Sequence, residues 1–533
     1  MERHGDEGGG LLDSSGDAGL VRKLGMVDLI LLGIGASIGS GIFVITGTVA
    51  HDAGPGVAVS FALAGAACVL NALCYAELSS RFPALVGGAY LYSRETFNEL
   101  VGFLVFVHLM FDYHVGAANI ARSLASYLAS LLQNLFPALR KTMPLWIGPG
   151  GLELLNGWLS INALAPALLA MLSAVLCMGV RESATLNTVM TINKVCIVLL
   201  VVAVGIFQID VSNWTPFAPT GFSGIVTGAT VVFFAYVGFD AVANSAEESK
   251  NPKRDLPIGI IASLLVCAVL YIAVSLVVTG MVPYYLLDGE APLANAFSGR
   301  GLKFISVLID IGAVFGLTTT LLVGLYVQSR LYLGLGRDGL LPSIFARIHP
   351  KHHTPVYGQL WVATVAGVLA LVLDVSHLSH ILSVGCLVGY ATVCACVVML
   401  RLRNEEQRNQ RDEQPRWREA VFCLLGVAVL GLIVGILVRF KVHFAFSIAG
   451  LVLAALVAVP LYTRQEYRIP QGFPCPWVPA VPLVSIFFNM ALFSQLHWEA
   501  FVRFVILSVA AVAFFFLYGK KRPPYQKASV EEH

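Results

Sequence analysis

Three ionisable side chains inside long apolar runs are the residues of this sequence best placed to do chemistry. Lys194 lies in NTVMTINKVCIVLLV, Asp240 in FFAYVGFDAVANSAEE and Asp112 in LMFDYHVG. A charged side chain in a membrane segment is costly, and it usually marks a substrate, ion or proton site. The three residues are therefore the first candidates for a functional site.

A glycine-rich stretch, GIGASIGSGIFV at 33–44, weakens one of these apolar runs at its middle. Glycine costs roughly 1 kcal/mol relative to alanine inside a helix, and an unwound turn in lipid leaves backbone groups unpaired unless it lines a cavity. Close helix packing through Gly35 and Gly39 is the alternative explanation. A second interruption, at Gly238 beside Asp240, favours two broken helices that open a binding site.

The elements that carry these residues are membrane-spanning helices. The chain is 57% hydrophobic and 12% charged, against roughly 25% charged in soluble domains. Most Lys and Arg residues fall in alternate loops, which predicts cytosolic termini. We expect an all-α polytopic membrane protein with about fourteen spans, at 26–48, 56–76, 100–121, 160–180, 187–209, 223–243, 257–281, 302–329, 357–373, 378–400, 420–438, 443–463, 476–495 and 500–518.

The two weakened helices stand first and sixth in this series, at the start of successive groups of five. Interrupted helices at corresponding positions of two halves predict an inverted-repeat transporter. The expected organisation is a disordered cytosolic tail (1–25), a ten-helix core (26–400), a cytosolic linker (401–419), four additional helices (420–518) and a second cytosolic tail (519–533).

Other classes of site are disfavoured. The glycines do not form the GxGxxG dinucleotide motif, because position 38 is isoleucine and no strand precedes them. HPKHHTP at 349–355 lies in a basic loop, and His377 and His380 are better explained as a polar helix mouth than as metal ligands. We expect no enzyme activity, no metal, no cofactor and no nucleic-acid partner.

Several motifs resemble the amino acid–polyamine–organocation superfamily, and most of all its cationic amino acid transporters. They are GIGASIGSGIFV, FFAYVGFDAVANSAEESKNPKRDLPIGI (233–260) and GLGRDGLLPSIFARIHPKHHTP (334–355). The resemblance covers roughly residues 20–520 and has a plant-like character. It implies a core of two inverted five-helix repeats and an amino acid bound between the two broken helices.

Backbone groups at the breaks are the expected substrate ligands. Amides at the start of a half-helix stabilise a carboxylate, and freed carbonyls stabilise an ammonium. Phe234 matches an aromatic lid over the substrate in relatives, although it could equally be an ordinary packing residue. The predicted binding residues are Ile38, Gly39, Ser40, Gly41, Phe234, Ala235, Val237 and Gly238, together with Asp112.

The resemblance also implies a coupling site. A lysine at the position of Lys194 approaches the backbone of the first helix, where related folds bind sodium, and such a lysine can exchange a proton. Thr318, Thr319 and Thr320 match hydroxyl positions beside it. The alternative is a lysine that snorkels to the interface. Asp240 matches an acidic position that senses protons, or it anchors its own helix by hydrogen bonds.

The substrate class rests on two acids. Asp112 matches a position near the guanidinium end of arginine in relatives, which favours Lys, Arg or ornithine. Glu99 matches an acidic position typical of cationic transporters, and its alternative is an interfacial residue paired with Arg94. Neutral or acidic amino acids stay open, because the other expected pocket residues are generic.

These observations favour a proton-linked transporter or exchanger of amino acids that works by alternating access. A channel is disfavoured because no rings of repeated charge are present. A transport-derived sensor that signals through 401–418 is a further alternative. The pattern ExxxLL, which ends at Leu11 and Leu12, predicts a sorting adaptor as partner and favours a vacuolar or endomembrane location over the plasma membrane.

Overall fold

The structure is a computed structural model and is almost entirely helical, as the sequence predicts. It describes residues 22–39, 41–82, 87–136, 144, 146–147, 152–154, 159–287, 292–373, 384–402, 413–440, 442–496 and 498–518. Within these residues one small antiparallel sheet occurs, in which β1 (Leu152–Leu154) pairs with β2 (Leu159–Ile161).

Apolar helices occupy every segment that the hydropathy pattern predicts. In the described part of the chain, ten helices are long and apolar enough to cross a membrane, and four shorter apolar helices lie in the other four segments. The length and composition of a helix do not show where a membrane lies, so the number of membrane crossings stays a prediction. The helices are α1 (Met26–Ser37), α2 (Thr46–Ala53), α3 (Val57–Arg81), α4 (Gly88–Thr96), α5 (Glu99–Leu135), α7 (Leu164–Met178), α8 (Val180–Gly205), α9 (Gly221–Val232), α10 (Phe239–Ala243), α11 (Pro252–Met281), α12 (Pro292–Gly299), α13 (Lys303–Arg337), α14 (Val356–Val372), α16 (Val384–Leu402), α17 (Glu413–Arg439), α18 (Phe444–Thr463), α19 (Ala480–Phe493) and α20 (Trp498–Tyr518).

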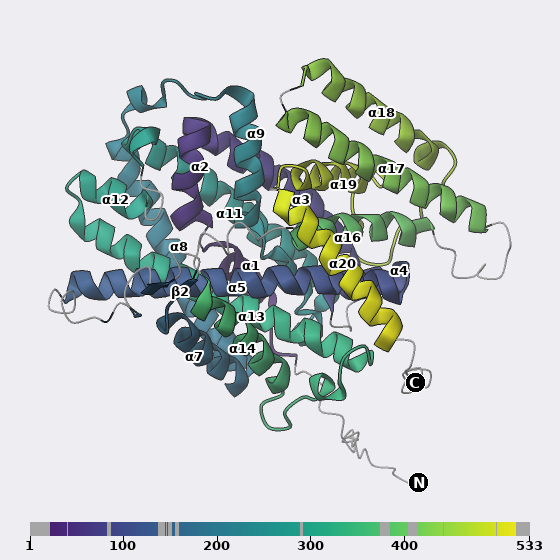
Figure 1. Ribbon diagram of the computed structural model, residues 1–533, viewed down its shortest axis with the longest axis horizontal. Coiled ribbons are helices and arrows are strands. Elements are labelled where there is room, and N and C mark those ends of the chain that lie inside the picture. The colour runs from purple at the N-terminus through teal and green to yellow at the C-terminus, as the bar shows by residue number, and fades with distance from the viewer. Residues whose placement is uncertain are drawn as a thin grey trace, which may run out of the picture.

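The central helix of the molecule is α5, which runs through the middle of Figure 1. Asn98 begins it, because its side chain accepts a hydrogen bond from the Val101 amide at 2.9 Å and so satisfies one of the free donors of the first turn. With 37 residues it is about 56 Å long at 1.5 Å per residue. This length lets it pack against α13, α14, α16 and α20.

Both glycine-weakened helices are interrupted. The first ends as α1 at Ser37, passes through Ile38 and Gly39, and resumes with a π-helical turn at Gly41–Ile45 that leads into α2. The sixth segment consists of α9, a 3-10 turn at Phe233–Tyr236 and α10. The extended residue Val237 and Gly238 lie between the turn and α10. Gly238 has φ of 140°, a conformation that side-chain-bearing residues rarely adopt. The structure therefore interrupts both helices where the glycines predict a break, whereas the repeat symmetry stays a prediction.

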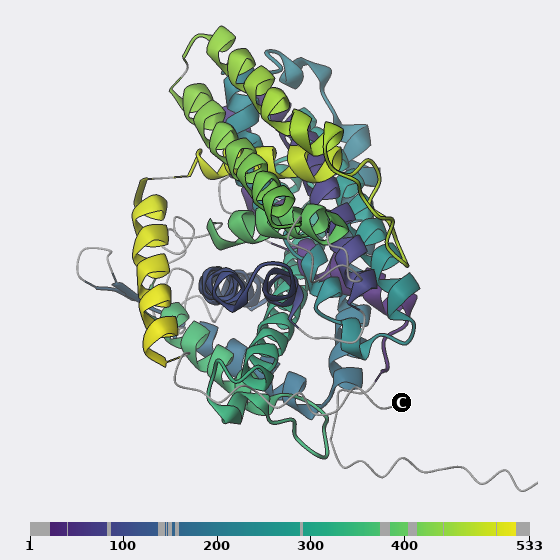
Figure 2. The same ribbon diagram turned by 90° about the vertical axis from the view of Figure 1, so that its right-hand side faces the viewer.

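The four C-terminal helices divide into two groups. α17 packs against α18 and α19, and α19 also contacts α3 and α16. α20 instead crosses α5, and Figures 1 and 2 show it apart from the α17–α18 pair. These helices thus flank the core at two separate places.

Two expected domain boundaries differ from the structure. Leu24, placed in the disordered tail, is 3% exposed, and its backbone pairs with that of Glu248 and Lys250. The linker expected at 401–419 is helical at both ends, because α16 continues to Leu402 and α17 begins at Glu413. The sorting residues Leu11 and Leu12 and the C-terminal tail lie outside the described residues.

Candidate substrate site

A cavity of about 80 Å³ lies between the two interrupted helices and is closed by α5, α13 and α16. A water needs roughly 10–15 Å³ by the same measure, so the cavity has room for several water-sized groups. Eight of the predicted residues line it: Gly41, Asp112, Phe234, Ala235, Val237, Gly238, Asp240 and Thr320.

The remaining predicted residues lie elsewhere. The structure assigns no place on the cavity wall to Ile38, Gly39, Glu99, Lys194, Thr318 and Thr319. Ser40 lies outside the described residues. The predicted residues that the structure describes therefore split into a group on the cavity wall and a group away from it, and the first group is the one placed to touch a ligand in this conformation.

The two breaks touch each other at a glycine. A Cβ atom added at Gly41 would lie 2.7 Å from the Cα of Ala235, closer than real Cβ atoms come to backbone. A Cβ at Gly238 would lie 2.9 Å from the Ser37 amide nitrogen and 2.8 Å from the Cβ of Ala36. The glycines of both breaks thus allow two unwound backbones to approach closely, which a side chain would prevent.

Lys194 binds the backbone of the first break from behind. Its Nζ donates to the carbonyls of Gly35 and Ile38 at 2.9 and 2.7 Å, and to the Thr319 hydroxyl at 2.6 Å. The side chain is fully buried, so it points into the protein and does not snorkel to an interface. Because the Ile38 carbonyl accepts from this ammonium, it belongs to the lysine site.

The three threonines of α13 separate into three environments. Thr319 contacts Lys194, whereas Thr320 lines the cavity and lies 3.2 and 3.4 Å from the Gly35 and Ile38 carbonyls. Thr318 donates to Val314 of its own helix at 2.7 Å. Among the three, Thr320 therefore contacts the first break directly, and Thr319 is linked to it through Lys194.

Tyr271 of α11 connects the two breaks and was not predicted. Its hydroxyl lies 2.7 Å from the Ser37 carbonyl and 2.9 Å from the Ala235 carbonyl, and its side chain is fully buried. One hydroxyl proton can serve one carbonyl at a time, so Tyr271 can alternate between the two helices. A lone tyrosine in an apolar run carries no sequence signal for this position.

Asp240 provides a hydrogen-bond acceptor for the backbone of the second break. Its Oδ1 accepts from the Gly238 amide at 3.1 Å, and the Tyr113 hydroxyl donates to its Oδ2. The residue lies in the first turn of α10, where the helix dipole favours a negative charge. Asp240 therefore anchors its own helix, as one of the two sequence hypotheses states, and it lines the cavity as well.

Asp112 accepts hydrogen bonds from the start of α16, which the sequence does not reveal. Its Oδ2 accepts from the Gly385 and Cys386 amides at 2.7 and 3.1 Å, at the start of α16. The residue is 4% exposed and lines the cavity. Asp112 thus caps α16 while it presents a carboxylate to the cavity wall.

Glu99 lies away from the cavity. It is exposed at the first turn of α5, 13 residues and therefore about 20 Å along the helix from Asp112. Its alternative role, a pair with Arg94, is also absent among the described contacts, because Arg94 pairs with Glu95 and Asp338. We therefore assign Glu99 no contact with substrate.

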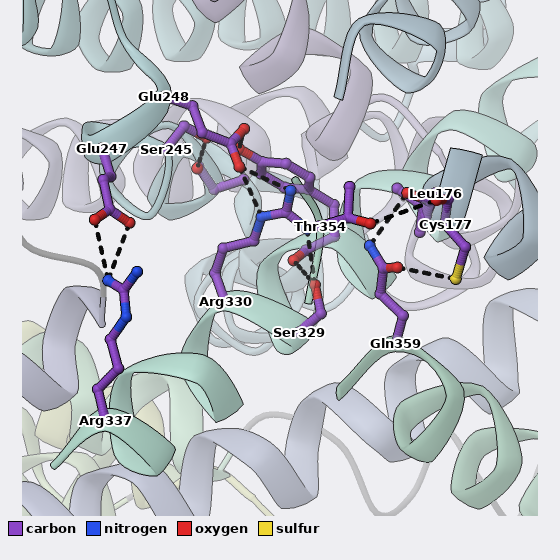
Figure 3. A network of polar contacts seen from close by, with 12 residues as sticks. Leu176, Cys177, Ser245, Glu247, Glu248, Ser329, Arg330, Arg337, Thr354 and Gln359 are labelled. Atoms are coloured by element: carbon purple, nitrogen blue, oxygen red, sulfur yellow. Dashed lines mark hydrogen bonds and ion pairs between the residues drawn. The ribbon is translucent and has the colours of Figure 1, made fainter. Parts of the chain in front are cut away.

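A buried ion pair ties α13 to the segment that follows α10 (Figure 3). Arg330 binds Glu248 at 2.7 Å with both side chains 1% exposed, and Tyr326 donates to the same carboxylate at 2.5 Å. Beside it, Arg337 binds Glu247 at 3.0 Å. The Glu248 carbonyl also accepts from the Leu24 amide. This network joins the entry of α1, the segment that follows α10, and α13.

Family comparisons agree with this architecture. The amino acid permease family matches residues 24–457, and a second family, the C-terminus of AA_permease, matches 473–523. A cationic amino acid transporter 9, chloroplastic, of Arabidopsis thaliana is 63% identical over 95% of this chain and 89% of its own length.

Two relatives from Bacillus subtilis have names that indicate other substrates. The branched-chain amino acid permease BcaP is 33% identical over 95% of each chain. A methylthioribose transporter is 42% identical over 73% of this chain and 83% of its own. The chain therefore belongs to the amino acid permease family, within the amino acid–polyamine–organocation superfamily that its motifs resemble, and it is a membrane transporter and not an enzyme.

Proposed function

We propose that the chain is a secondary active transporter of cationic amino acids, which works by alternating access with proton coupling or exchange. The observation that carries the proposal is the charge of the cavity. Asp112 and Asp240 line it, and among the described lining residues no basic side chain does. A wall of one sign in a low-dielectric cleft favours a ligand of the opposite sign. The Arabidopsis relative, which is named a cationic amino acid transporter, supports the same class.

The substrate backbone binds at the two breaks in this proposal. The half-helix that starts at Gly41 directs the amides of its first turn toward the break, and in this proposal the amides that precede Phe43, whose own amide donates to the Gly39 carbonyl, take the carboxylate. The Ala235 carbonyl, which Tyr271 can release, takes the ammonium. Phe234 lines the cavity beside them and packs over the bound amino acid.

Coupling uses the two charged residues at the breaks. Lys194 holds the end of α1 through two carbonyls, so loss of its proton removes the positive charge and one of the three N–H donors that fix this helix against α8. Asp240 holds the start of α10 and faces the cavity, so it can take a proton when a cation leaves. Symport and exchange differ in whether these protons cross with the substrate.

A transporter of uncharged amino acids is the second candidate. The observation that favours it is the pair of amides on Asp112 Oδ2, because they offset part of the charge available to a substrate. The branched-chain permease among the relatives is consistent with this alternative.

Uptake by purified protein in proteoliposomes tests the proposal. Radiolabelled arginine should enter in a saturable manner and exchange by counterflow, and a panel of twenty unlabelled amino acids should rank arginine, lysine and ornithine as the strongest competitors. Strong competition by leucine or valine with none by arginine would establish the uncharged class. Binding of arginine without flux would instead identify a sensor.

The membrane is proposed to be that of an organelle, with both termini in the cytosol. The acidic dileucine at Leu11 and Leu12 favours the vacuole, whereas the Arabidopsis relative, which is named chloroplastic, favours the chloroplast. A fluorescent fusion at the C-terminus decides between them. Leu11→Ala with Leu12→Ala should move a vacuolar protein to the plasma membrane, while transport in proteoliposomes is unchanged. An identical pattern for both forms would remove the sorting role.

A further inference from the structure

Gln328 of α13 carries a buried amide oxygen that no described group satisfies. Its side chain is 1% exposed, and Nε2 donates to the Gly324 carbonyl at 3.2 Å. This bond fixes which end of the amide is which, and it leaves Oε1 without a partner. Gln328 also lines the cavity. Buried acceptors are nearly always hydrogen-bonded, so an open one on a cavity wall indicates a donor that the protein itself does not supply.

The position of Gln328 along α13 separates it from the breaks. Among the residues of α13 that line the cavity, Thr320 is the one at the first break, because its hydroxyl lies beside the Ile38 carbonyl. Gln328 follows eight residues later, about 12 Å farther along the helix axis. A substrate whose backbone is held at the breaks, as the proposed function has it, therefore directs its side chain toward Gln328.

Asp112 lies near the same end of the cavity. The rings of Phe106 and His114, on either side of it in α5, both contact Tyr332 of α13, with centroids 5.5 and 5.9 Å apart. Gln328 precedes Tyr332 by about one helical turn. A neutral acceptor and a carboxylate thus occupy the end of the cavity that a long side chain would reach.

We infer that Gln328 is a specificity-determining residue whose Oε1 accepts a hydrogen bond from the terminal nitrogen of the substrate side chain. The ligand class is an amino acid with a long side chain that ends in N–H donors, such as arginine or lysine. Short amino acids such as alanine leave this acceptor unused. The inference rests on the proposed function, because it needs the substrate backbone to bind at the breaks.

The test compares Gln328→Met with the parent protein in proteoliposomes. Methionine keeps the length and volume of the side chain and removes the acceptor. The KM for arginine should rise roughly 10- to 150-fold, the range for a hydrogen bond to a charged group, whereas the KM for alanine should change less than about twofold. Gln328→Glu, which restores an acceptor with a charge, should return arginine to within about threefold of the parent.

Gln359→Met is the matched control. Gln359 is also 1% exposed, but Cys177 and Leu176 satisfy both ends of its amide away from the cavity (Figure 3). This variant should leave the ratio of the two KM values unchanged even where expression falls.

The outcomes separate the inference from the proposed function. A parent protein that transports arginine, with an unchanged KM ratio in Gln328→Met, overturns the inference alone and assigns the open oxygen to a bound water. A parent that transports branched-chain amino acids and no arginine overturns both. A selective loss of arginine in Gln328→Met, with rescue by Gln328→Glu, establishes the inference.

Discussion

The two interrupted helices are stabilised by opposite charges. At the first break an ammonium, that of Lys194, donates to the carbonyls of Gly35 and Ile38. At the second break a carboxylate, that of Asp240, accepts from the amide of Gly238. Both charged side chains are buried. A charged donor therefore binds the free carbonyls at the first break, and a charged acceptor binds a free amide at the second.

The difference follows from which helix end each break exposes. A helix that ends leaves carbonyls free and carries partial negative charge, and a helix that begins leaves amides free and carries partial positive charge. The lysine reaches α1 from another helix, α8, whereas the aspartate belongs to the helix it caps. A change in the charge of Lys194 therefore affects the packing of α1 against α8, whereas a change in the charge of Asp240 affects the start of its own helix, α10.

The largest effect is expected where the breaks touch. Gly41→Ala places a Cβ within 2.7 Å of the Ala235 backbone, and overpacking of this kind costs about 1–3 kcal/mol. Uptake should fall roughly 5- to 150-fold while the protein still inserts into membranes. Gly367→Ala is the control, because its new Cβ finds ordinary contact at 3.6 Å. Equal uptake by both variants would show that the breaks have room to separate.

Lys194→Met tests the first break. The substitution removes a charged donor from two carbonyls and a hydroxyl, and hydrogen bonds to charged groups are worth about 1.5–3 kcal/mol each. Uptake driven by a pH gradient should fall at least about tenfold. Lys194→Arg should retain more activity, since it keeps the charge. Accumulation by Lys194→Met with the parent's dependence on the pH gradient would refute a coupling role.

Asp240→Asn tests the second break with a smaller perturbation. The asparagine carbonyl can still accept from Gly238, so the fold is kept, but the side chain no longer gains or loses a proton. The pH profile of uptake should flatten, whereas counterflow of alanine, which carries no side-chain charge, should stay within about threefold of the parent at constant pH. A pH profile identical to that of the parent would restrict Asp240 to its structural role.

The sequence predicts the backbone features of this site better than its side-chain geometry. Four glycines in one apolar run, and Gly238 beside an aspartate in another, locate both breaks because an unwound turn in lipid needs a cavity. The buried charge of Lys194 likewise has few explanations inside a membrane segment. These predictions use local rules, and the structure agrees with them in position.

Contacts between distant helices could not be predicted in the same way. Asp112 caps α16 across 273 residues of sequence, and the Arg330–Glu248 pair joins residues 82 apart. Such separations in the chain give no signal of contact, because tertiary packing determines which distant residues meet. Glu99 shows the converse, since its residue type suggests selectivity and its place at the start of α5 excludes contact with the cavity.

Tyr271→Phe is the smallest change and the most direct test of whether the breaks move together. It removes one hydroxyl that lies between the Ser37 and Ala235 carbonyls, and a neutral hydrogen bond contributes about 0.5–1.5 kcal/mol. Uptake should fall about two- to tenfold. Tyr236→Phe is the matched control, because this buried hydroxyl binds the Phe61 carbonyl at 2.8 Å and so ties the second break to α3. If Tyr271 couples the breaks, its loss should be non-additive with Lys194→Met, whereas loss of Tyr236 should be additive. Additivity in both double variants would mean that the two breaks rearrange independently, each held by its own charge.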